Sequence, residues 1–348
     1  MELLVSIVIP FVIAAGGTRL AMALAARLHF LDQPGAEAHK QHAAAVPYGG
    51  GLAIAVAVAA GMLFCRQFPT SLLGDIDLDH ARLWPIYGGA AVLLAIGMID
   101  DRRPLKALHK LIAQAVVAAV VIPTADLPID SLQHWPWLAF LVSWGWMVLV
   151  TNAFNLLDHA DGLAASVAVV SIAVLLGGAV LDNDVRQASL YLVMFAALVG
   201  FLMWNLPPAQ VYMGDAGSMP LGFLIAAGTL SVTFWPSGTS GASSLAVLTP
   251  VIITAIPLFD STVVICKRLR NRKPIFTGDR NHISHRLNRL GYSPSVSLAI
   301  VVLLQVALAG SAFTLRLGDQ VAGVVALAQD AAILIAVVML ETIRTPHD

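Results

Sequence analysis

Long apolar segments follow one another along almost the whole chain and constrain its fold more than any other feature. We expect spans at Leu3–Leu28, Gly51–Phe64, Leu83–Ile99, Leu111–Ile122, Trp137–Val150, Leu163–Leu181, Leu190–Leu206, Leu221–Phe234, Leu245–Cys266, Val296–Leu315 and Val321–Leu340. A helix that crosses a bilayer needs about 20 apolar residues. Only 12% of the 348 residues are charged, whereas a soluble domain carries about 25%. The sequence therefore predicts an all-α integral membrane protein with about eleven transmembrane helices, in a single polytopic membrane domain that covers residues 1–348.

Positively charged residues predict how these helices are oriented. If the N-terminus lies outside, 15 of the 20 Lys and Arg residues fall in connections on the cytoplasmic side or in the C-terminal tail. Lys and Arg concentrate on the cytoplasmic side of membrane proteins. We therefore expect the N-terminus to be outside.

Five clusters of polar and charged residues all fall on this cytoplasmic side. They lie at residues 32–51, 100–101, 152–161, 212–218 and 279–285. An even distribution over ten connections would seldom produce this bias. It favours one composite site that faces the cytoplasm over a set of unrelated solvated loops.

Two adjacent carboxylates, Asp100 and Asp101, end one apolar span and are followed by Arg102, Arg103 and Lys110. Charges at a membrane boundary are costly unless they meet a metal ion or opposite charges. Such a pair can bind a metal or act as a general base toward a hydroxyl or a phosphate. The alternative is a salt-bridged helix end with no chemical role.

The stretch from Asn152 to Asp161 packs two amides and two carboxylates between two spans. Asp158 and Asp161 are three residues apart, which places both on one side of a helical turn. They repel each other unless a positive group lies beside them. Taken alone, the stretch also fits a solvated hairpin loop, but the other clusters on the same side favour a site.

Gly214, Asp215 and Gly217 place a carboxylate between two glycines. Glycine lets the backbone approach a ligand closely. Mg²⁺ usually takes one or two protein carboxylates together with phosphate oxygens, so this turn suits a magnesium–phosphate complex. The motif is weak on its own, because Gly-Asp-x-Gly occurs in many turns.

Two basic segments complete the cytoplasmic side. Residues 267–289 carry eight Lys and Arg residues, with His282 and His285 among them. Topology alone requires a basic loop here, and a Zn²⁺ site would lack a third ligand, so phosphate binding by the arginines fits better. Lys40 and His42 precede a glycine-rich run at residues 47–51, which by itself predicts only a turn.

Carboxylates, cations and glycine-rich turns on one membrane surface indicate phosphoryl transfer from a soluble, negatively charged donor to a lipid-borne acceptor, with a metal neutralising the diphosphate. Nothing in the sequence indicates binding of nucleic acid. An intramembrane aspartyl protease would need glycine where Tyr212 stands. A lipid transporter would place charges near the midplane, where Arg19 is the one candidate.

The motifs resemble those of the polyprenyl-phosphate N-acetylhexosamine-1-phosphate transferase superfamily (MraY/WecA-like, glycosyltransferase family 4). They run in the family's order over most of the chain. They are Asp32-x-Pro34 with Lys40-x-His42 and Pro47-x-x-Gly50-Gly51, Gly97 to Asp101 with Lys110 and Gln114, Asn152 to Gly162, Met213 to Ser218, and Asp279-Arg-x-His-Ile-x-His-Arg-Leu287. The family's fold of eleven helices with a cytoplasmic active site agrees with the topology expected above.

The resemblance implies roles for individual residues. The catalytic set is Asp100, Asp101, Lys110, Asp158, Asp215 and His282. The substrate-binding set is Lys40, His42, Asn152, Asn155, Asp161, Tyr212, Gly214, His285 and Arg286, with Tyr212 placed to stack on uracil. Mg²⁺, with Mn²⁺ as the alternative, would be held by Asp215 as principal ligand, with Asp100 and Asp101 at the reacting phosphates.

The implied reaction transfers N-acetylhexosamine-1-phosphate, by preference GlcNAc-1-phosphate, from a UDP-sugar to undecaprenyl phosphate and releases UMP. It would be the first membrane step of a cell-envelope glycan pathway, in the bacterial inner membrane. UDP-MurNAc-pentapeptide, as in the MraY-type enzymes, or another UDP-N-acetyl sugar is the alternative donor. Membrane lipids are the expected surroundings, and a homodimer is left open.

Two positions depart from the family pattern. Ser284 stands where WecA-like members usually have histidine, and His159 stands where a small or amide residue is usual, followed by Ala160 at an apolar position. With His282 and His285 present, we expect Ser284→His to be tolerated.

Overall fold

The computed structural model describes residues 2–28, 30–32, 45–67, 83–127, 132, 134–231, 244–274 and 281–342. Most of these residues are helical. The described strands are β1 (Leu31–Asp32) and β2 (Val46–Pro47), a short antiparallel pair in which Leu31 faces Pro47. The expected all-α class is confirmed.

The helices follow the order of the apolar segments. They are α1 (Glu2–Arg27), α2 (Gly50–Gln67), α3 (Leu83–Arg102), α4 (Ala107–Thr124), α5 (Pro136–Leu157), α6 (Leu163–Leu181), α7 (Val185–Asn205), α8 (Asp215–Ser231), the 3-10 helix η2 (Ser244–Leu248), α9 (Thr249–Ile253), α10 (Ala255–Arg270), α11 (Ile283–Arg289), α12 (Pro294–Leu317) and α13 (Gln320–Thr342). Hydropathy thus predicts where the helices lie, because burial in lipid or protein requires apolar side chains in either case.

The number of spans is the point on which structure and expectation differ. Within the described residues, eight helices are long and apolar enough to cross a membrane, and a ninth span results if one bent pair is counted. The chain is therefore a multi-pass membrane protein, but the count of eleven is not confirmed. The shortfall comes from α2 and α8, since the apolar part of α2 and the 17 residues of α8 are shorter than a full span.

The expected span at Leu245–Cys266 is broken rather than straight. Residues Ser244–Ile253 and Ala255–Arg270 meet at an angle of 71°. The carbonyl oxygen of Ile253 accepts hydrogen bonds from Ser171 Oγ at 2.8 Å and from Gln305 Nε2 at 2.7 Å, while Gln305 Oε1 accepts from the Ile256 N–H at 3.2 Å. Backbone groups inside a membrane must be paired by the protein. Side chains of α6 and α12 therefore pair the backbone groups that the break leaves without a helical partner.

The start of α8 lies against α2 and α3 because glycines remove the side chains between them. A Cβ atom on Gly97 would collide with the backbone of Asp215 and Ala216, and one on Gly51 would lie 2.7 Å from the carbonyl carbon of Ala216. This close approach brings the C-terminal end of α3 to the N-terminal end of α8. The carboxylates at those two ends become neighbours.

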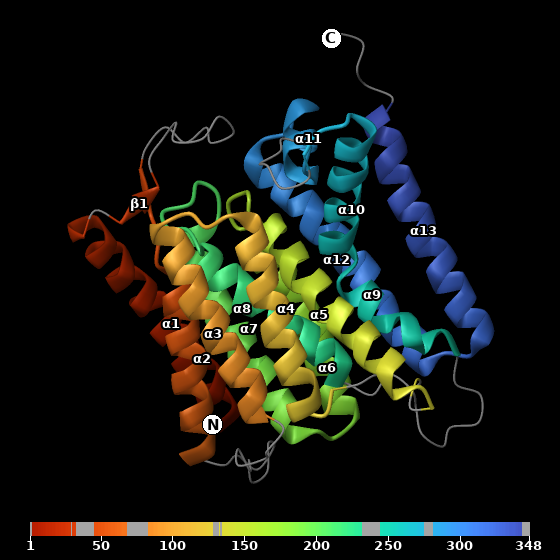
Figure 1. The fold of residues 1–348 in the computed structure, drawn as a ribbon, viewed down its shortest axis with the longest axis horizontal. Helices are drawn as coiled ribbons and strands as arrows, with labels where there is room; N and C mark the ends of the chain where they lie inside the picture. The colour runs from red at the N-terminus through yellow and green to blue at the C-terminus, as the bar shows by residue number, and fades with distance from the viewer. Residues whose placement is uncertain are drawn as a thin grey trace.

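One end of the helical assembly carries most of the short elements. Figure 1 shows β1 and α11 at this end, while α1 begins at the opposite end. An isolated bridge pairs Tyr48, next to β2, with Tyr212, just before α8. The described parts of the polar clusters therefore meet at one end of the molecule, as expected.

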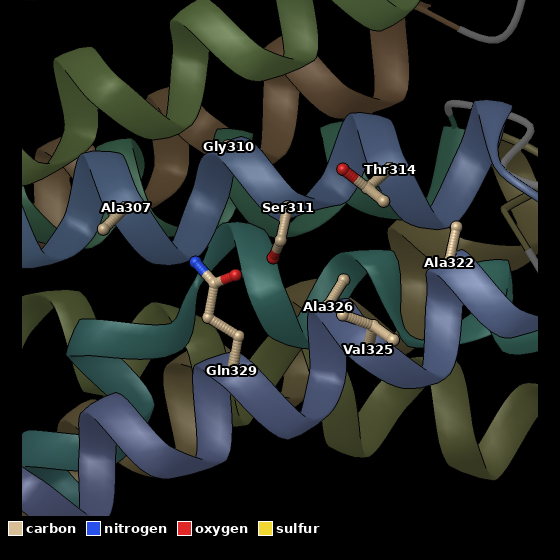
Figure 2. A pocket seen from close by; sticks show the side chains of 8 residues that line it. All are labelled: Ala307, Gly310, Ser311, Thr314, Ala322, Val325, Ala326 and Gln329. Carbon is tan, nitrogen blue, oxygen red and sulfur yellow. The ribbon is translucent and has the colours of Figure 1, made fainter.

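A pocket of about 380 Å³ lies between α12 and α13, away from these clusters. It is lined largely by small side chains, and Figure 2 shows Ser311 and Gln329 pointing toward each other across it. Ser311 Oγ also donates to the buried carboxylate of Asp330 at 2.5 Å. None of the predicted site residues lines this pocket.

Candidate active site

Three carboxylates and one lysine form the centre of the site. Asp100 and Asp101 lie in the last turn of α3, and Asp215 is the first residue of α8. One oxygen of each carboxylate lies within 4.8 Å of the others. Lys110, at the start of α4, places its Nζ 3.2 Å from Asp100 Oδ2 and 2.6 Å from Asp215 Oδ2. We call this group the acidic cluster.

The backbone holds Asp101 and Asp100 in place. Asp101 accepts hydrogen bonds from the N–H groups of Asp215 at 2.8 Å and Ala216 at 3.2 Å. These N–H groups open α8 and have no partner within the helix, and they favour a negative charge. Asp100 Oδ1 accepts from the Leu105 N–H at 2.7 Å, which folds the link between α3 and α4 back toward the cluster.

Gly214 is the residue that makes this arrangement sterically allowed. Its φ angle is +68°, a conformation that residues with a side chain rarely adopt. A Cβ atom here would lie 2.7 Å from Asp101 Oδ1. The glycine before Asp215 is therefore a requirement of the carboxylate geometry.

The loop between α5 and α6, residues 158–162, lies beside the acidic cluster. Burial raises the pKa of the Asp158 carboxyl well above its ordinary value, and the negative charges of Asp215, Asp101 and Asp161 raise it further. Asp161 Oδ2 accepts from the Ala209 N–H at 2.9 Å. This contact ties the loop to the segment that precedes α8.

The two amides predicted for this region lie on the last turns of α5. Asn155 Nδ2 donates to Ser218 Oγ at 3.0 Å, so α5 and α8 are joined next to the cluster. Asn152 lies one turn earlier and is partly exposed. Both side chains belong to α5, and Asp158 directly follows the last residue of this helix.

A second group of polar side chains surrounds Asp260, which is buried in α10. Asp260 Oδ2 lies 2.7 Å from His282 Nδ1, and Asp260 Oδ1 accepts from the Ile283 N–H at 2.6 Å. Arg286 approaches the same carboxylate at 3.5 Å. All of these side chains are buried. We call Asp260, His282, Arg286 and the adjacent His285 the histidine cluster.

His159 connects the loop after α5 to the histidine cluster. Its ring stacks on that of His282, with centroids 4.0 Å apart and planes 25° apart, and lies 5.2 Å from the ring of His285. Its Nε2 is 2.7 Å from Ser284 Oγ. The two positions at which the sequence departs from the family pattern are thus in direct contact.

Tyr212 lies between the glycine-rich turn and the acidic cluster. Its N–H donates to the Pro47 carbonyl at 2.9 Å, its carbonyl accepts from the Gly50 N–H at 3.1 Å, and its ring lies 6.2 Å from that of Tyr48. The predicted residues Lys40 and His42 lie outside the described residues.

The structure thus brings most of the predicted residues to one place, in two clusters joined by residues 158–162. The roles assigned to them stay predictions. Sequence reasoning did not include Asp260 in the site and noted His159 only as a departure. A signal for Asp260 existed, because a carboxylate within an apolar span is by default a functional candidate.

The sequence of this chain is similar to those of known proteins. The model of glycosyl transferase family 4 matches residues 83–233, which contain the acidic cluster and the loop after α5. The probable undecaprenyl-phosphate N-acetylglucosaminyl 1-phosphate transferase of Bacillus subtilis (strain 168) is 31% identical over 327 residues, which is 90% of this chain and 86% of that protein. The undecaprenyl-phosphate alpha-N-acetylglucosaminyl 1-phosphate transferase of Salmonella typhi is 30% identical over 85% of this chain and 79% of its own.

A decaprenyl-phosphate N-acetylglucosaminephosphotransferase of Mycolicibacterium smegmatis is 28% identical over 86% of this chain and 78% of its own. The fold and the site define a multi-pass membrane protein with a lysine-bridged acidic cluster at one end of its helices. Similarity over nearly its full length identifies its family: the chain belongs to glycosyl transferase family 4.

Proposed function

We propose that this protein transfers GlcNAc-1-phosphate from UDP-GlcNAc to undecaprenyl phosphate and releases UMP, as the first membrane step of a cell-envelope glycan pathway. The names of relatives that match most of the chain support the acceptor and the transferred group. The structural observation that carries the proposal is the acidic cluster bridged by Lys110, where α3 ends and where α4 and α8 begin. A cation among carboxylates at a membrane surface suits a reaction in which every reactant is a phosphate.

The chemistry is a displacement at phosphorus. An oxygen of the undecaprenyl phosphate forms a bond to the phosphorus that carries the sugar. The bond from that phosphorus to the oxygen shared with the uridine-bearing phosphate breaks, and its electron pair leaves with UMP. One phosphoanhydride is consumed and one is formed.

The protein's own residues supply orientation and charge. Lys110 offers a positive charge to the phosphates while it offsets the repulsion between Asp100 and Asp215. Asn155, Asp158 and Asp161 would line the nucleotide side, with Tyr212 under the uracil. His282, His285 and Arg286 would face the sugar and its phosphate.

Mg²⁺ fits the acidic cluster by its chemistry, with Mn²⁺ as the alternative. Three carboxylates and one lysine leave a net negative charge, and their hard oxygen atoms are the ligands that Mg²⁺ prefers. Asp215, with Asp100 and Asp101, would hold the ion. When bound, it would neutralise charge on the diphosphate.

The assay that tests the proposal uses purified protein, Mg²⁺, undecaprenyl phosphate and a panel of UDP-sugars that includes UDP-GlcNAc and UDP-MurNAc-pentapeptide. We expect UMP release with UDP-GlcNAc that depends on the lipid phosphate. Activity with UDP-MurNAc-pentapeptide and with no other UDP-sugar would mean that this compound, and not UDP-GlcNAc, is the donor. UMP release without the lipid would refute the transferase.

We further propose that the protein lies in the bacterial inner membrane with its N-terminus outside and the site facing the cytoplasm. Cysteine labelling tests this in a background without Cys65 and Cys266. Asn183→Cys, exposed between α6 and α7, should react from outside, and Lys273→Cys, exposed after α10, only after permeabilisation. The reverse pattern would refute the orientation. Cross-linking in the same membranes would test whether the protein forms a homodimer.

A further inference from the structure

His159 makes two hydrogen bonds that leave it one protonation pattern. Its Nδ1 is 3.0 Å from the carbonyl oxygen of Leu156, and its Nε2 is 2.7 Å from Ser284 Oγ. A carbonyl oxygen only accepts, so Nδ1 carries the proton and donates. In the neutral ring, Nε2 is then the unprotonated nitrogen and accepts from the Ser284 hydroxyl. The ring is fixed at both ends, to α5 on one side and to α11 on the other.

The surroundings of His159 agree with a neutral ring. Burial and the neighbouring His282 lower the pKa of His159 to about 3. At neutral pH the ring is therefore uncharged. It acts as a flat, rigid surface with one donor and one acceptor.

His282 is held by His159 and Asp260 together. Asp260 contacts Nδ1 of His282, and the ring of His159 covers its face at 4.0 Å. These two contacts determine the ring plane of His282. The neighbours His285 and Arg286 belong to the short helix α11, which begins directly after His282.

A metal ion held by His159, Asp260 and His282 is the other explanation for this grouping, since their ligand atoms lie within 4.8 Å of one another. Both ring nitrogens of His159 are already hydrogen-bonded, and His282 Nδ1 is bonded to Asp260. Hydrogen bonds alone account for the arrangement.

We propose that His159 is a positioning residue that joins the loop carrying Asp158 and Asp161 to the histidine cluster, and that Ser284 is its obligatory partner. The proposal rests on the proposed function, because it assigns the pair a part in binding and orienting the UDP-sugar. His159 itself need not touch the substrate. It acts through the ring of His282 and through the loop on either side of it.

The two positions share one space. Ser284 is only 4% exposed, and its hydroxyl points at the ring of His159. A histidine at 284 beside His159 would need room that the existing ring fills. This revises the expectation that Ser284→His alone is tolerated. The imidazole can come from position 159 or from position 284, but not from both.

A double-variant cycle tests the proposal. We compare wild type, His159→Gly, Ser284→His and the double variant by UMP release, with kcat and KM for UDP-GlcNAc measured separately. Each single change should lower kcat/KM about tenfold or more, and the double variant should recover to within about threefold of wild type. If the two positions were independent, the fold-losses in kcat/KM of the two single variants would multiply in the double variant. A double variant with this multiplied loss would overturn the proposal.

Two hydroxyl variants serve as a matched pair. Ser284→Ala removes the donor to His159 without changing the space, and should raise KM for UDP-GlcNAc several-fold with a smaller change in kcat. Ser297→Ala removes an equally buried hydroxyl whose 2.7 Å hydrogen bond goes to Asn288, and should leave both constants unchanged. Equal effects of the two would mean that the Ser284 hydroxyl is merely structural and would overturn the proposal.

Ring ¹⁵N chemical shifts of His159 separate this proposal from the proposed function. If the wild type released no UMP with any UDP-sugar, the function would fail, but the shifts would still report on the pair. We expect the Nδ1–H tautomer in both proteins, because the Leu156 carbonyl accepts from Nδ1 in both. The shift of Nε2 should differ in Ser284→Ala, because this nitrogen loses the hydroxyl that donates to it. Identical shifts in the two proteins would overturn the pairing whatever the activity.

Discussion

Lys110 Nζ lies 2.6 Å from Oδ2 of Asp215, although the two residues are 105 positions apart in the chain. The same ammonium group is 3.2 Å from Asp100 Oδ2. One positive charge is therefore shared by carboxylates from two other helices. About a fifth of the side chain of Lys110 and of Asp215 is exposed, so a bound phosphate can reach the pair.

Asp215→Asn should lower UMP release by about 10²-fold or more. A neutral amide binds Mg²⁺ poorly and no longer pairs with Lys110. The protein should still insert and fold, as judged by a single symmetrical peak in gel filtration. Asp319→Asn, near the start of α13 and exposed, is the matched control and should behave as wild type. Near-normal turnover of Asp215→Asn would remove this residue from the proposed metal site.

Lys110→Gln should also cost about 10²-fold in kcat/KM. Without the ammonium group, Asp100 and Asp215 face each other with no cation between them, and part of the attraction for phosphate is lost. Lys106→Gln, exposed on the link between α3 and α4, removes an equal charge away from the cluster. If both variants lost activity equally, the loss would come from the change in overall charge and not from the ion pairs of Lys110 with Asp100 and Asp215.

Gly214→Ala should lower activity at least tenfold and reduce thermal stability. An alanine at φ +68° costs roughly 1–2 kcal/mol, and its Cβ would displace the Asp101 carboxylate. Gly88→Ala is the control, because a Cβ atom there meets nothing within 4 Å. That change should leave activity unchanged and add up to about 1 kcal/mol of helix stability. Full activity in Gly214→Ala would contradict the steric requirement.

The low pKa of His159 predicts a dependence of stability on pH. The folded ring has a pKa of about 3, whereas an unfolded histidine titrates near 6.5. Below pH 6.5 the unfolded chain takes up a proton that the folded protein refuses, so the stability present above pH 6.5 is lost as pH falls toward 3. At pH 5 the loss is at most about 2 kcal/mol. The melting temperature of wild type should thus fall more between pH 7.5 and pH 5 than that of His159→Asn. Equal falls in the melting temperatures of the two proteins would refute the lowered pKa of His159.

The proposed reaction should be reversible. Since one phosphoanhydride is exchanged for another, the equilibrium constant should lie within a few powers of ten of unity, each tenfold being about 1.4 kcal/mol. Labelled UMP, added to enzyme with lipid-linked product and Mg²⁺, should appear in UDP-sugar, and EDTA should stop the exchange. A hydrolase would release UMP and return no label.

The order and location of the helices could be predicted from the sequence because hydropathy is a local property. Even the shortest expected span, Leu111–Ile122, corresponds to the long helix α4, Ala107–Thr124. The gathering of polar clusters at one end also followed, since it needs only the alternation of helix directions. The number of full spans could not be predicted, because the length of a helix such as α8 depends on where packing ends it.

Side-chain pairs between distant elements could not be predicted. Ser284 and His159 are 125 positions apart, and neither residue type alone implies the other. Asp260 lies in α10 and His282 directly before α11, and the apolar pattern around Asp260 indicates only a span. The bend between α9 and α10 likewise depends on Gln305, 49 positions after Ile256.

That distance has a consequence for biogenesis. A ribosome has made α9 and α10 well before it reaches Gln305, so the carbonyl and amide groups at the bend enter the membrane without one of their partners. Until α12 is inserted, the unpaired backbone groups at the bend make the broken segment unstable in lipid. A chain that ends before Gln305 should therefore be removed by membrane proteases, and replacing Gln305 with leucine should lower the amount of protein that accumulates.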